Sequence, residues 1–421
     1  MELTIERLTT GGAGIGFHDG KAIFVPYAAP GDRVEVAIKR DKKRHATATL
    51  LKVLEKGPAR DEPICPVYGQ CGGCQIQHLT TEGRAGYKSM VVKETLERIG
   101  HFTDPPMQPL IAAKKETDYR SRCGLKIRWV DGEALVGFFQ TASKKVVNIP
   151  GCPVLHPKLE ALIEPLRAMV GELNKPERLP QVDLRMGDEG LGMIFHMLSI
   201  PSQRDKNLLK KFAFRHNVTQ VWVQQGDKQG RSPLVTKSPL RYRPDDHHSL
   251  TFMPGDFTQA HLGQNRLLVK QAIKLMGQGT KALDLFSGIG NFTFSLREQF
   301  TDVLGIEGDE QAVKRGMKNA EGREGVRFET QNLFDEQVCA ELPLEGVEAI
   351  LVDPPREGAV ELAKRLKETS HNLVWVSCDP ATFARDANIL CSGRYQLASV
   401  QPVDMFPMTS HVELVAHFTA K

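Results

Sequence analysis

Eight cysteines are spread through this 421-residue sequence, and four of them have a spacing that could hold a metal. Cys65, Cys71 and Cys74 lie close together in CPVYGQCGGC, and Cys152 follows much later in GCPVL. Three thiols at this spacing make an incomplete site for a four-coordinate metal ion or an iron–sulfur cluster. Cys152 is therefore a candidate for the fourth ligand.

A fifth cysteine, Cys378, is a candidate nucleophile. It follows the apolar run NLVWV in VSCDPATFARD, so we expect it at the carboxyl end of a strand and just before a helix. A helix N-terminus can favour the thiolate. A buried structural thiol is the usual state of a lone cysteine, and that interpretation suits Cys339 and Cys391. The segment LVDPPREG ends another strand in the same way and delivers Asp353 and Arg356.

A thiolate of this kind has a clear use in methyl transfer to uracil. C5 of uracil is a poor nucleophile, and addition of sulfur at C6 turns it into an electron-rich enolate carbon. A base must then remove the C5 proton so that the thiolate can leave. Glu413, in the terminal segment SHVELV, is the candidate base. His411 is its rival, although we interpret it as an exposed histidine of an edge strand.

A methyl-donor site is indicated by LDLFSGIGNF, which places a glycine-rich turn between a strand and a helix. Gly288 and Gly290 permit a tight turn and close approach of a ligand to the backbone. Glu307 ends the next strand, where an acid can bind the two ribose hydroxyls of an adenosine. The third glycine of a dinucleotide fingerprint is absent, so the turn favours S-adenosylmethionine over NAD.

The elements that must hold these residues fall into three parts. Residues 1–58 read as short strands with glycine turns, which predicts a small barrel. Residues 59–253 read as a linker, a helix at about 82–100 and a β-rich region. In residues 254–421 strands alternate with helices, which predicts a doubly wound α/β sheet, with an antiparallel terminal strand at its edge.

Composition and charge indicate where the protein acts and what kind of partner it binds. The sequence has no run of about 18 apolar residues and no apolar signal core, so we expect a cytoplasmic protein without a membrane contact. The net charge of +4 is uneven: residues 1–60 hold 11 Lys and Arg against 7 Asp and Glu, and residues 201–243 hold 10 against 2. Two basic segments in a chain that is otherwise acidic form two basic islands. They favour binding to nucleic acid over a purely solvent-exposed role for these charges.

Taken together, these motifs resemble the bacterial RNA 5-methyluridine methyltransferases, close to the iron–sulfur members that modify 23S ribosomal RNA. The resemblance covers nearly the whole chain. The segment GGAGIG…GKAIFVP…GDRVEV is similar to a TRAM domain, an RNA-binding barrel, and CPVYGQCGGCQIQH with GCPVL to a four-cysteine [4Fe–4S] site. DLFSGIGNF, DPPREG, SCDPATFARD and HVEL are similar, in order and spacing, to the class I methyltransferase domain.

The resemblance implies a role for each site residue, in a monomeric enzyme that binds RNA. It implies that Cys378 is the nucleophile and Glu413 the base, and that the helix at 82–100 packs on the catalytic domain. Ser287 departs from the usual cysteine of DLFCG, which alters no assigned role. The remaining assignments are S-adenosylmethionine at Gln259, Phe286, Asn291, Glu307, Asn332 and Asp353, and a [4Fe–4S] cluster at Cys65, Cys71, Cys74 and Cys152.

Several alternatives stay open at this point. Zinc is the rival to the cluster, and Cys123 is a spare fourth ligand, although the proline and glycine beside Cys152 fit a ligand loop better. The substrate is 23S ribosomal RNA or transfer RNA. A radical methylthiotransferase is disfavoured by the C-x5-C-x2-C spacing, and a cytosine-5 methyltransferase by the lack of a cysteine beside Pro354 and Pro355. A non-catalytic iron–sulfur RNA sensor would not need Cys378 and Glu413.

Overall fold

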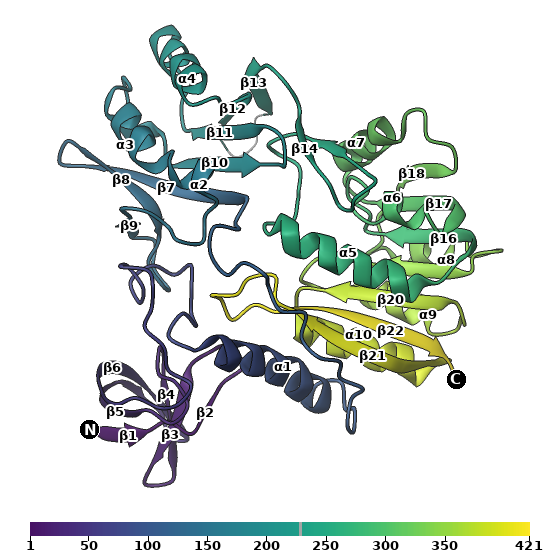
Figure 1. Ribbon diagram of the computed structural model, residues 1–421, viewed down its shortest axis with the longest axis horizontal. Coiled ribbons are helices and arrows are strands. Elements are labelled where there is room, and N and C mark those ends of the chain that lie inside the picture. Colours follow the sequence, from purple (N-terminus) through teal and green to yellow (C-terminus); the bar gives the residue numbers. More distant parts are fainter. Residues whose placement is uncertain (227–229) are drawn as a thin grey trace.

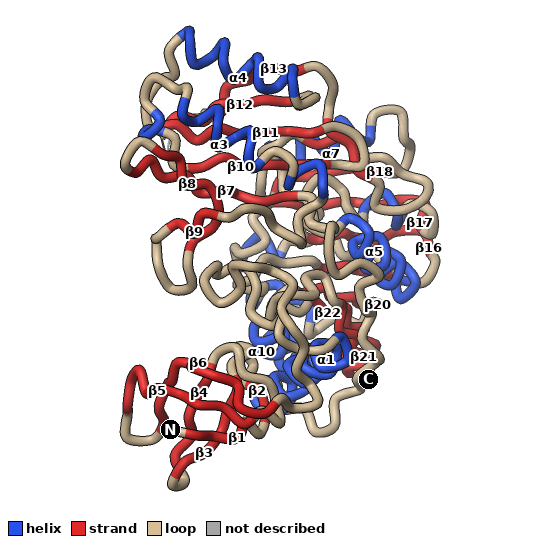
Figure 2. The backbone as a smooth tube through the Cα atoms, turned by 60° about the vertical axis from the view of Figure 1, so that its left-hand side comes forward, coloured by secondary structure: helices blue, strands red, loops and turns tan. Residues whose placement is uncertain are grey.

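The structure of the protein is a computed structural model that describes residues 1–226 and 230–421. Figure 1 shows three groups of strands: the N-terminal strands at the lower left, the central strands at the upper left and the C-terminal strands on the right. The turned view in Figure 2 keeps the N-terminal and central groups well apart. Within the described ranges, no helix has the length and apolar character needed to cross a membrane.

The N-terminal strands form a six-stranded sheet of order β1-β5-β6-β4-β3-β2. Alternate residues such as Leu3, Val34 and Val36 are buried, as a strand with one face toward a core requires. The buried carboxylate of Asp32 accepts hydrogen bonds from the N–H groups of Ala29 and Gly57 and so ties the end of this sheet to the following segment. The strands are β1 (Glu2–Thr4), β2 (Arg7–Leu8), β3 (Gly14–His18), β4 (Lys21–Val25), β5 (Arg33–Asp41) and β6 (His45–Glu55).

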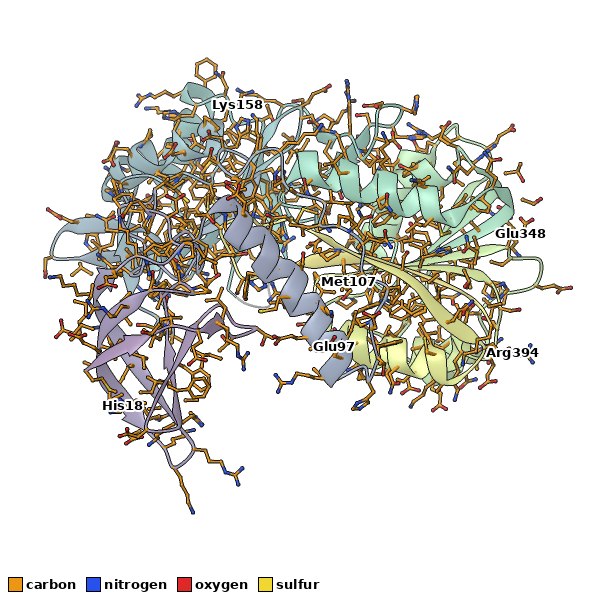
Figure 3. All side chains as sticks on the ribbon, turned by 60° about the horizontal axis from the view of Figure 1, so that its bottom comes forward. His18, Glu97, Met107, Lys158, Glu348 and Arg394 are labelled. Atoms are coloured by element: carbon orange, nitrogen blue, oxygen red, sulfur yellow. The ribbon has the colours of Figure 1, made fainter. Side chains whose placement is uncertain are left out.

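The long helix α1 (Thr81–Arg98) connects the N-terminal sheet to the C-terminal part of the chain. Thr80 caps it, because its hydroxyl accepts a hydrogen bond from the N–H of Gly83. The hydroxyl of Tyr87 donates to the carbonyl of Thr10 at 2.7 Å. Beyond the helix, the chain runs along the edge of the C-terminal sheet, where Met107 pairs with Val400 (Figure 3). This segment covers a sheet edge that would otherwise stay open.

The central strands form a seven-stranded sheet of order β13-β12-β11-β10-β7-β8-β9. Its core includes Leu125, Val182 and Phe195, packed against helices that the sequence reading did not predict. The strands are β7 (Arg122–Val130), β8 (Glu133–Phe139), β9 (Val146–Asn148), β10 (Gln181–Met186), β11 (Leu191–Met197), β12 (Gln220–Gln225) and β13 (Arg231–Thr236). The helices are α2 (Pro157–Glu160), α3 (Ile163–Gly171), the short 3₁₀ turn η1 (Pro176–Arg178) and α4 (Gln203–Arg215); a small pair, β14 (Leu240–Tyr242) and β15 (Leu250–Phe252), follows.

The C-terminal strands form a seven-stranded sheet of order β18-β17-β16-β19-β20-β22-β21. Its first five strands are parallel, and β22 is antiparallel to β20 and β21. The terminal strand therefore lies one position inside the edge, and the edge strand is β21, which the sequence reading missed. The strands are β16 (Gly279–Leu285), β17 (Phe300–Glu307), β18 (Val326–Thr330), β19 (Ala349–Val352), β20 (Asn372–Ser377), β21 (Tyr395–Val403) and β22 (Glu413–Ala420).

Helices cover both faces of this C-terminal sheet, which is why its central strands are continuous apolar runs. On one face, Leu268 and Ala272 of α5 pack against the strands. On the other face, α1 and α10 pack together, through residues such as Val91 and Ala387. The helices are α5 (Leu262–Met276), α6 (Thr293–Leu296), α7 (Glu310–Ala320), α8 (Glu336–Ala340), α9 (Val360–Leu366) and α10 (Pro380–Ser392).

Candidate active site

The glycine-rich turn after β16 leaves room for a ligand. Gly288 and Gly290 have φ angles of 56° and 100°, and the non-glycine Phe286 has a φ of 64°. A Cβ at Gly290 would lie 2.4 Å from the ring of Phe294, whereas a Cβ at Gly288 would have no described atom within 4 Å. Left-handed backbone at Phe286 is costly and occurs mainly at functional sites. The turn is therefore closely packed behind Gly290 and open beside Gly288.

Glu307 is held beside this turn at the end of β17. Its two carboxylate oxygens accept hydrogen bonds from the N–H of Gly288 at 3.0 Å and from the N–H of Asp309 at 2.8 Å. The parallel pairing of Leu285 with Ile306 brings the two strand ends together. Because a carboxylate oxygen can accept more than one hydrogen bond, Glu307 retains capacity for a vicinal diol such as a ribose.

Two carboxyl groups near Glu307, the buried Asp284 and the half-buried Asp353, have raised pKa values. Burial raises the pKa of Asp284 to about 7, and burial together with the charge of Glu307 raises the pKa of Asp353 to about 7. Thr293 donates to one oxygen of Asp284 at 2.5 Å, and the other oxygen has no hydrogen-bond partner in the described residues. Acids with raised pKa values at one end of the sheet favour a cationic ligand, which would lower these pKa values.

An aromatic pair stands at the same end of the sheet. The rings of Phe286 and Phe334 have centroids 5.5 Å apart, and Phe334 is 45% exposed. The side-chain oxygen of Asn332, in the same loop, accepts the N–H of Phe334. An exposed aromatic ring beside a ligand turn offers a surface on which a planar base can stack. The sequence reading missed Phe334, whose position shortly after the predicted Asn332 was the available signal.

The structure gives Asn291 and Gln259 different surroundings. The amide of Asn291 is paired with the amide of Asn265, at 2.8 and 3.1 Å, and also accepts the hydroxyl of Tyr242. Gln259 is buried, and its carbonyl accepts the hydroxyl of Ser121 from the central part of the chain. The side chain of Asn291 is thus engaged with protein and fixes the turn against α5. Its direct contact with a donor stays a prediction.

Cys378 and Glu413 are brought together by strand pairing. β20 and β22 are antiparallel with Ser377 opposite Leu414, so the residue after β20 lies beside the first residue of β22. Cys378 is half-buried and Glu413 is buried. Two residues that are distant in the sequence therefore share one end of the sheet, as a nucleophile and a base must.

The state of the Cys378 thiol differs from the sequence-based expectation. Burial and the charges of Glu413 and Asp353 raise its pKa to about 11. The N-terminus of α10 is occupied by Asp379, whose carboxylate accepts the N–H groups of Ala381 and Thr382. The cap therefore pairs two of the N–H groups at the positive end of the helix, and a role for α10 in favouring the thiolate stays a prediction.

Glu413 is a buried acid with a strongly altered pKa. Burial and the charge of Asp353 raise the pKa to about 8, and the positive charges of Arg122, Lys88 and Arg356 only partly offset this. Its Oε2 atom has no hydrogen-bond partner in the part of the chain that the structure describes. A carboxyl group that titrates near neutral pH and has an unpaired oxygen is suited to proton transfer.

A groove of about 500 Å³ opens beside Cys378. Its walls come from Thr10 of the N-terminal sheet, from Arg98 and neighbouring residues of α1, and from His411. His411 is exposed in the loop before β22, and partial burial of its ring lowers its pKa. The groove therefore opens beside Cys378 on the side on which the N-terminal segment and α1 lie, and Glu413 is not among its lining residues.

The four predicted ligand cysteines line one separate cavity. Cys65, Cys71, Cys74 and Cys152 surround a space of about 120 Å³, which is otherwise lined largely by apolar and aromatic side chains. Cys123 is not among them; it lies in the core of the central sheet on β7. In the described ranges no three His, Cys, Asp or Glu side chains are close enough to hold a single metal ion.

Comparisons with known proteins agree with this geometry. Residues 92–420 match the family described as tRNA (Uracil-5-)-methyltransferase, and residues 1–59 match the TRAM domain of tRNA (uracil(54)-C(5))-methyltransferase. The chain is 37% identical, over 97% of its length and 96% of the relative's, to 23S rRNA (uracil(1939)-C(5))-methyltransferase RlmD of Thiobacillus denitrificans. The RlmD of Aeromonas hydrophila is 36% identical, over 100% of this chain and 96% of its own length.

A solved structure resembles the whole molecule. The crystal structure of the Pyrococcus abyssi tRNA (uracil-54, C5)-methyltransferase, in complex with S-adenosyl-L-homocysteine, matches with a TM-score of 0.77 and 27% identity. The match covers 100% of this chain and 99% of that one. That structure thus holds the demethylated form of S-adenosylmethionine on a similar fold.

Proposed function

This chain belongs to the RNA uracil-C5 methyltransferase family, and from that premise we propose that it methylates C5 of a uridine in 23S ribosomal RNA. S-adenosylmethionine is the methyl donor. The observation that carries the proposal is the juxtaposition of Cys378 and Glu413 at one end of the sheet that also bears the glycine-rich turn. The test is to map 5-methyluridine in 23S ribosomal RNA from cells with and without the gene. Unchanged 5-methyluridine would contradict it.

We infer the following roles for the two reacting side chains. The thiolate of Cys378 adds to C6 of the uracil, so that a C–S bond forms and the electron pair moves to C5 and the C4 carbonyl. The bound donor supplies a methyl group on a sulfonium, and C5 takes that methyl. The carboxylate of Glu413 then accepts the C5 proton, the C5–C6 double bond returns, and the sulfur of Cys378 leaves.

The same residues account for activation of the thiol. Burial, together with the charges of Glu413 and Asp353, raises the pKa of Cys378, so the free protein keeps it as a neutral thiol. A cationic sulfonium beside these carboxylates offsets their charge and makes the thiolate easier to form. Cys378 is thus expected to become reactive when the donor is in place, which protects the thiol in its absence.

We propose donor contacts from residues on several strand ends. Glu307 binds the ribose hydroxyls, and the open side of Gly288 lets the donor approach the backbone. Phe286 and Asn332 flank the adenine, with Phe334 added by the structure. Gln259 and Asp353 face the methionine end, and Asn291 holds the turn in place. The orphaned oxygens of Asp284 and Glu413 support a cationic ligand here.

We propose that Cys65, Cys71, Cys74 and Cys152 hold a [4Fe–4S] cluster. All four line one cavity of mostly apolar character, which suits a cluster bound by four thiolates. Four thiolates on one zinc ion would each lie about 2.3 Å from it and so close to one another. Thiolates on a cubane bind different corners and stand further apart. When bound, the cluster would cross-link two distant segments.

The comparisons favour ribosomal over transfer RNA as the substrate. The RlmD relatives are 36–37% identical over nearly the full length, whereas the transfer RNA enzyme of Pyrococcus abyssi is 27% identical. We further propose a division of labour in which residues 1–58 and 59–253 bind RNA and residues 254–421 catalyse. Methyl transfer to purified 23S ribosomal RNA, but not to transfer RNA, is the expected result in vitro. The opposite preference would reverse this assignment.

A further inference from the structure

The loop between β21 and β22, residues 404–412, is unusual because it is largely buried. Asp404, Met405, Pro407, Met408 and Thr409 are all buried, whereas connecting loops normally lie on the surface. Glu413 follows this loop directly, as the first residue of β22. The position of the carboxyl group of Glu413 therefore depends on how the loop is held.

The cysteine segment holds this loop by hydrogen bonds. The N–H groups of Gln75 and Ile76 both donate to the carbonyl of Met408, at 3.1 and 3.3 Å. The N–H of Ser410 donates to the side-chain oxygen of Gln75 at 3.3 Å. Gln75 directly follows Cys74, so its backbone and its side chain both join the cysteine segment to the loop.

Gln75 is also tied to the wall of the cysteine cavity. Its side-chain nitrogen donates to the carbonyl of Gly72 at 2.8 Å, between Cys71 and Cys74. Its own carbonyl accepts the hydroxyl of Tyr68 at 2.6 Å, and Tyr68 lines the cavity. A shift of the cysteine segment would therefore move Gln75, and with it the hydrogen bonds to the loop.

Packing reinforces the same connection. The side chain of Met408 packs with Tyr119 and Val154, in a cluster that Cys74 and Cys152 adjoin. At the start of the loop, the buried Lys88 of α1 pairs with Asp404 and donates to the carbonyl of Phe406 at 2.7 Å. In Figure 1 the yellow loop extends leftward from the C-terminal sheet, beyond the ends of its strands. One end of the loop is thus fixed by α1, and its middle by the cysteine segment.

We propose that Gln75 is a positioning residue that couples the four-cysteine site to the general base Glu413. This inference rests on the proposed roles of Glu413 and of the four cysteines. When the cysteine segment is held in place, Gln75 fixes residues 408–410 and Glu413 is placed for removal of the C5 proton. When that segment relaxes, the base is misplaced, while Cys378 at the end of β20 remains in position.

The expected consequence is selective for one step. Cys378 adds to the RNA before methyl transfer, and Glu413 acts after it. A misplaced base therefore slows release of the enzyme from RNA and leaves formation of the adduct unchanged. Displacement of a reacting group by about 1 Å can cost up to about 100-fold, so removal of a side-chain anchor should slow release by about 10-fold.

The experiment compares Gln75→Ala with the matched control Gln70→Ala. Gln70 is exposed in the same segment, does not line the cysteine cavity, and its side chain makes no hydrogen bond in the described chain. Single-turnover reactions on RNA tritiated at uracil C5 measure adduct formation on denaturing gels and release of the C5 proton. Iron content is measured for each variant.

Gln75→Ala is expected to form the adduct at the normal rate, to release the C5 proton about 10-fold more slowly and to retain its iron. Gln70→Ala should release the C5 proton at the normal rate. Gln75→Glu keeps an acceptor for Ser410 and should recover most of the release rate. Met408→Ala keeps the carbonyl that accepts from Gln75 and Ile76 but removes the packing of the Met408 side chain against the cysteine region, and should accumulate adduct as well.

Normal release in both Gln75→Ala and Met408→Ala would overturn the coupling, as would an equal loss of adduct formation and release. Equally slow release in Gln70→Ala would show a general effect of altering this segment and would also overturn the coupling. Glu413→Gln in the same assay separates the two proposals. If it traps no adduct, the base assignment fails; if it traps adduct while Gln75→Ala releases normally, only the coupling fails.

Discussion

The methyl-donor pocket and the cysteine cavity are built in opposite ways. The donor pocket gathers residues from the ends of neighbouring strands in one sheet, so the hydrogen-bonded strands fix their spacing. The cysteine cavity joins two segments without regular strands or helices, around residues 65–74 and at 152, and the first is held to its surroundings by single contacts such as the bridge from Cys71 to Gln140. The sheet preforms the first site, whereas the second depends on what its thiols bind.

This difference predicts that the two sites fail in different ways. Loss of a side chain from the donor pocket should reduce activity and leave the fold intact. Loss of a cysteine from the cavity should loosen the two segments that the cavity joins. This loosening should affect the active site only through the loop before Glu413. Variants of one site, assayed for the properties of both, can separate these two kinds of failure.

Cys378→Ala should give the largest effect, because it removes the atom that bonds to uracil. We expect turnover to fall by at least about 10³-fold and no covalent RNA adduct to form. Donor binding and iron content should stay within about twofold of the unaltered protein. Mass spectrometry of product RNA and calorimetric titration of the donor measure the first two quantities, and iron analysis the third. Residual turnover together with a covalent adduct would show that another residue is the nucleophile.

Cys152→Ser should remove the cluster and lower thermal stability, whereas Cys123→Ser should retain the iron. Anaerobically purified protein is expected to hold about four irons per chain, as one cubane requires. Iron analysis and thermal unfolding of the two variants provide the check. Stoichiometric zinc without iron would contradict the cluster, and iron loss in Cys123→Ser alone would move the fourth ligand to Cys123.

Glu307→Ala should weaken donor binding by about 10- to 100-fold, the usual effect of losing hydrogen bonds to a charged group. The iron content should not change, because Glu307 lies in the sheet and not in the cavity. Glu329→Gln, on the neighbouring strand β18, is exposed and serves as the matched control. Equal affinity of both variants for the donor would show that Glu307 does not bind it.

The buried acids predict a pH dependence that is specific to the donor pocket. The pKa values of Asp284 and Asp353 are raised to about 7 and that of Glu413 to about 8, whereas the unfolded chain ionises these groups near pH 4. The folded free protein thus binds more protons than the unfolded one, and its free energy of unfolding falls as pH rises from about 4 to about 8.

A cationic donor should offset this loss of stability. The rise in melting temperature caused by S-adenosylmethionine should therefore grow between pH 6 and pH 8, by about 2 °C. S-adenosyl-L-homocysteine lacks the sulfonium charge, so its effect should grow less. Thermal scans with both ligands at several pH values measure the difference. A parallel increase for the two ligands would show that the sulfonium does not meet these acids.

The basic surface should give the smallest effect and should involve neither site. Alanine at Lys42, Lys43 and Arg44, and at Lys210 and Lys211, removes exposed charges from the two basic islands. If these side chains bind phosphates, the log–log salt slope of RNA binding should flatten by about 0.7 for each phosphate that is no longer neutralised. An unchanged slope and affinity would identify both islands as solvated surface.

The strand ends that carry the proposed donor residues were predictable from the sequence, because buried parallel strands have a clear local pattern. The apolar runs before Phe286, Glu307, Asp353 and Cys378 mark parallel strands whose carboxyl ends must meet. The antiparallel strand of Glu413 also followed from the sequence. Its place one strand inside the edge did not, since local periodicity does not specify the pairing order within a sheet.

Other features of the sites could not be predicted from local sequence. The raised pKa of Cys378 comes from burial and from the charges of Glu413 and Asp353, which other strands of the sheet bring beside it. The paired amides of Asn265 and Asn291 join a helix to a turn, and the hydrogen bond between Gln75 and Ser410 spans 335 positions. Such contacts follow from how separate elements pack together, which a single sequence does not specify.

The most direct test of the central claim is the fate of the RNA adduct in Glu413→Gln. We expect this variant to form a covalent RNA–protein complex that survives denaturing gels, requires S-adenosylmethionine and already carries the new methyl group by mass spectrometry. Because a general base contributes about 10²- to 10⁴-fold, the complex should decay slowly. His411→Ala should turn over normally. A trapped adduct in His411→Ala with normal turnover in Glu413→Gln would contradict the assignment, and the absence of an adduct from every variant would contradict the covalent mechanism.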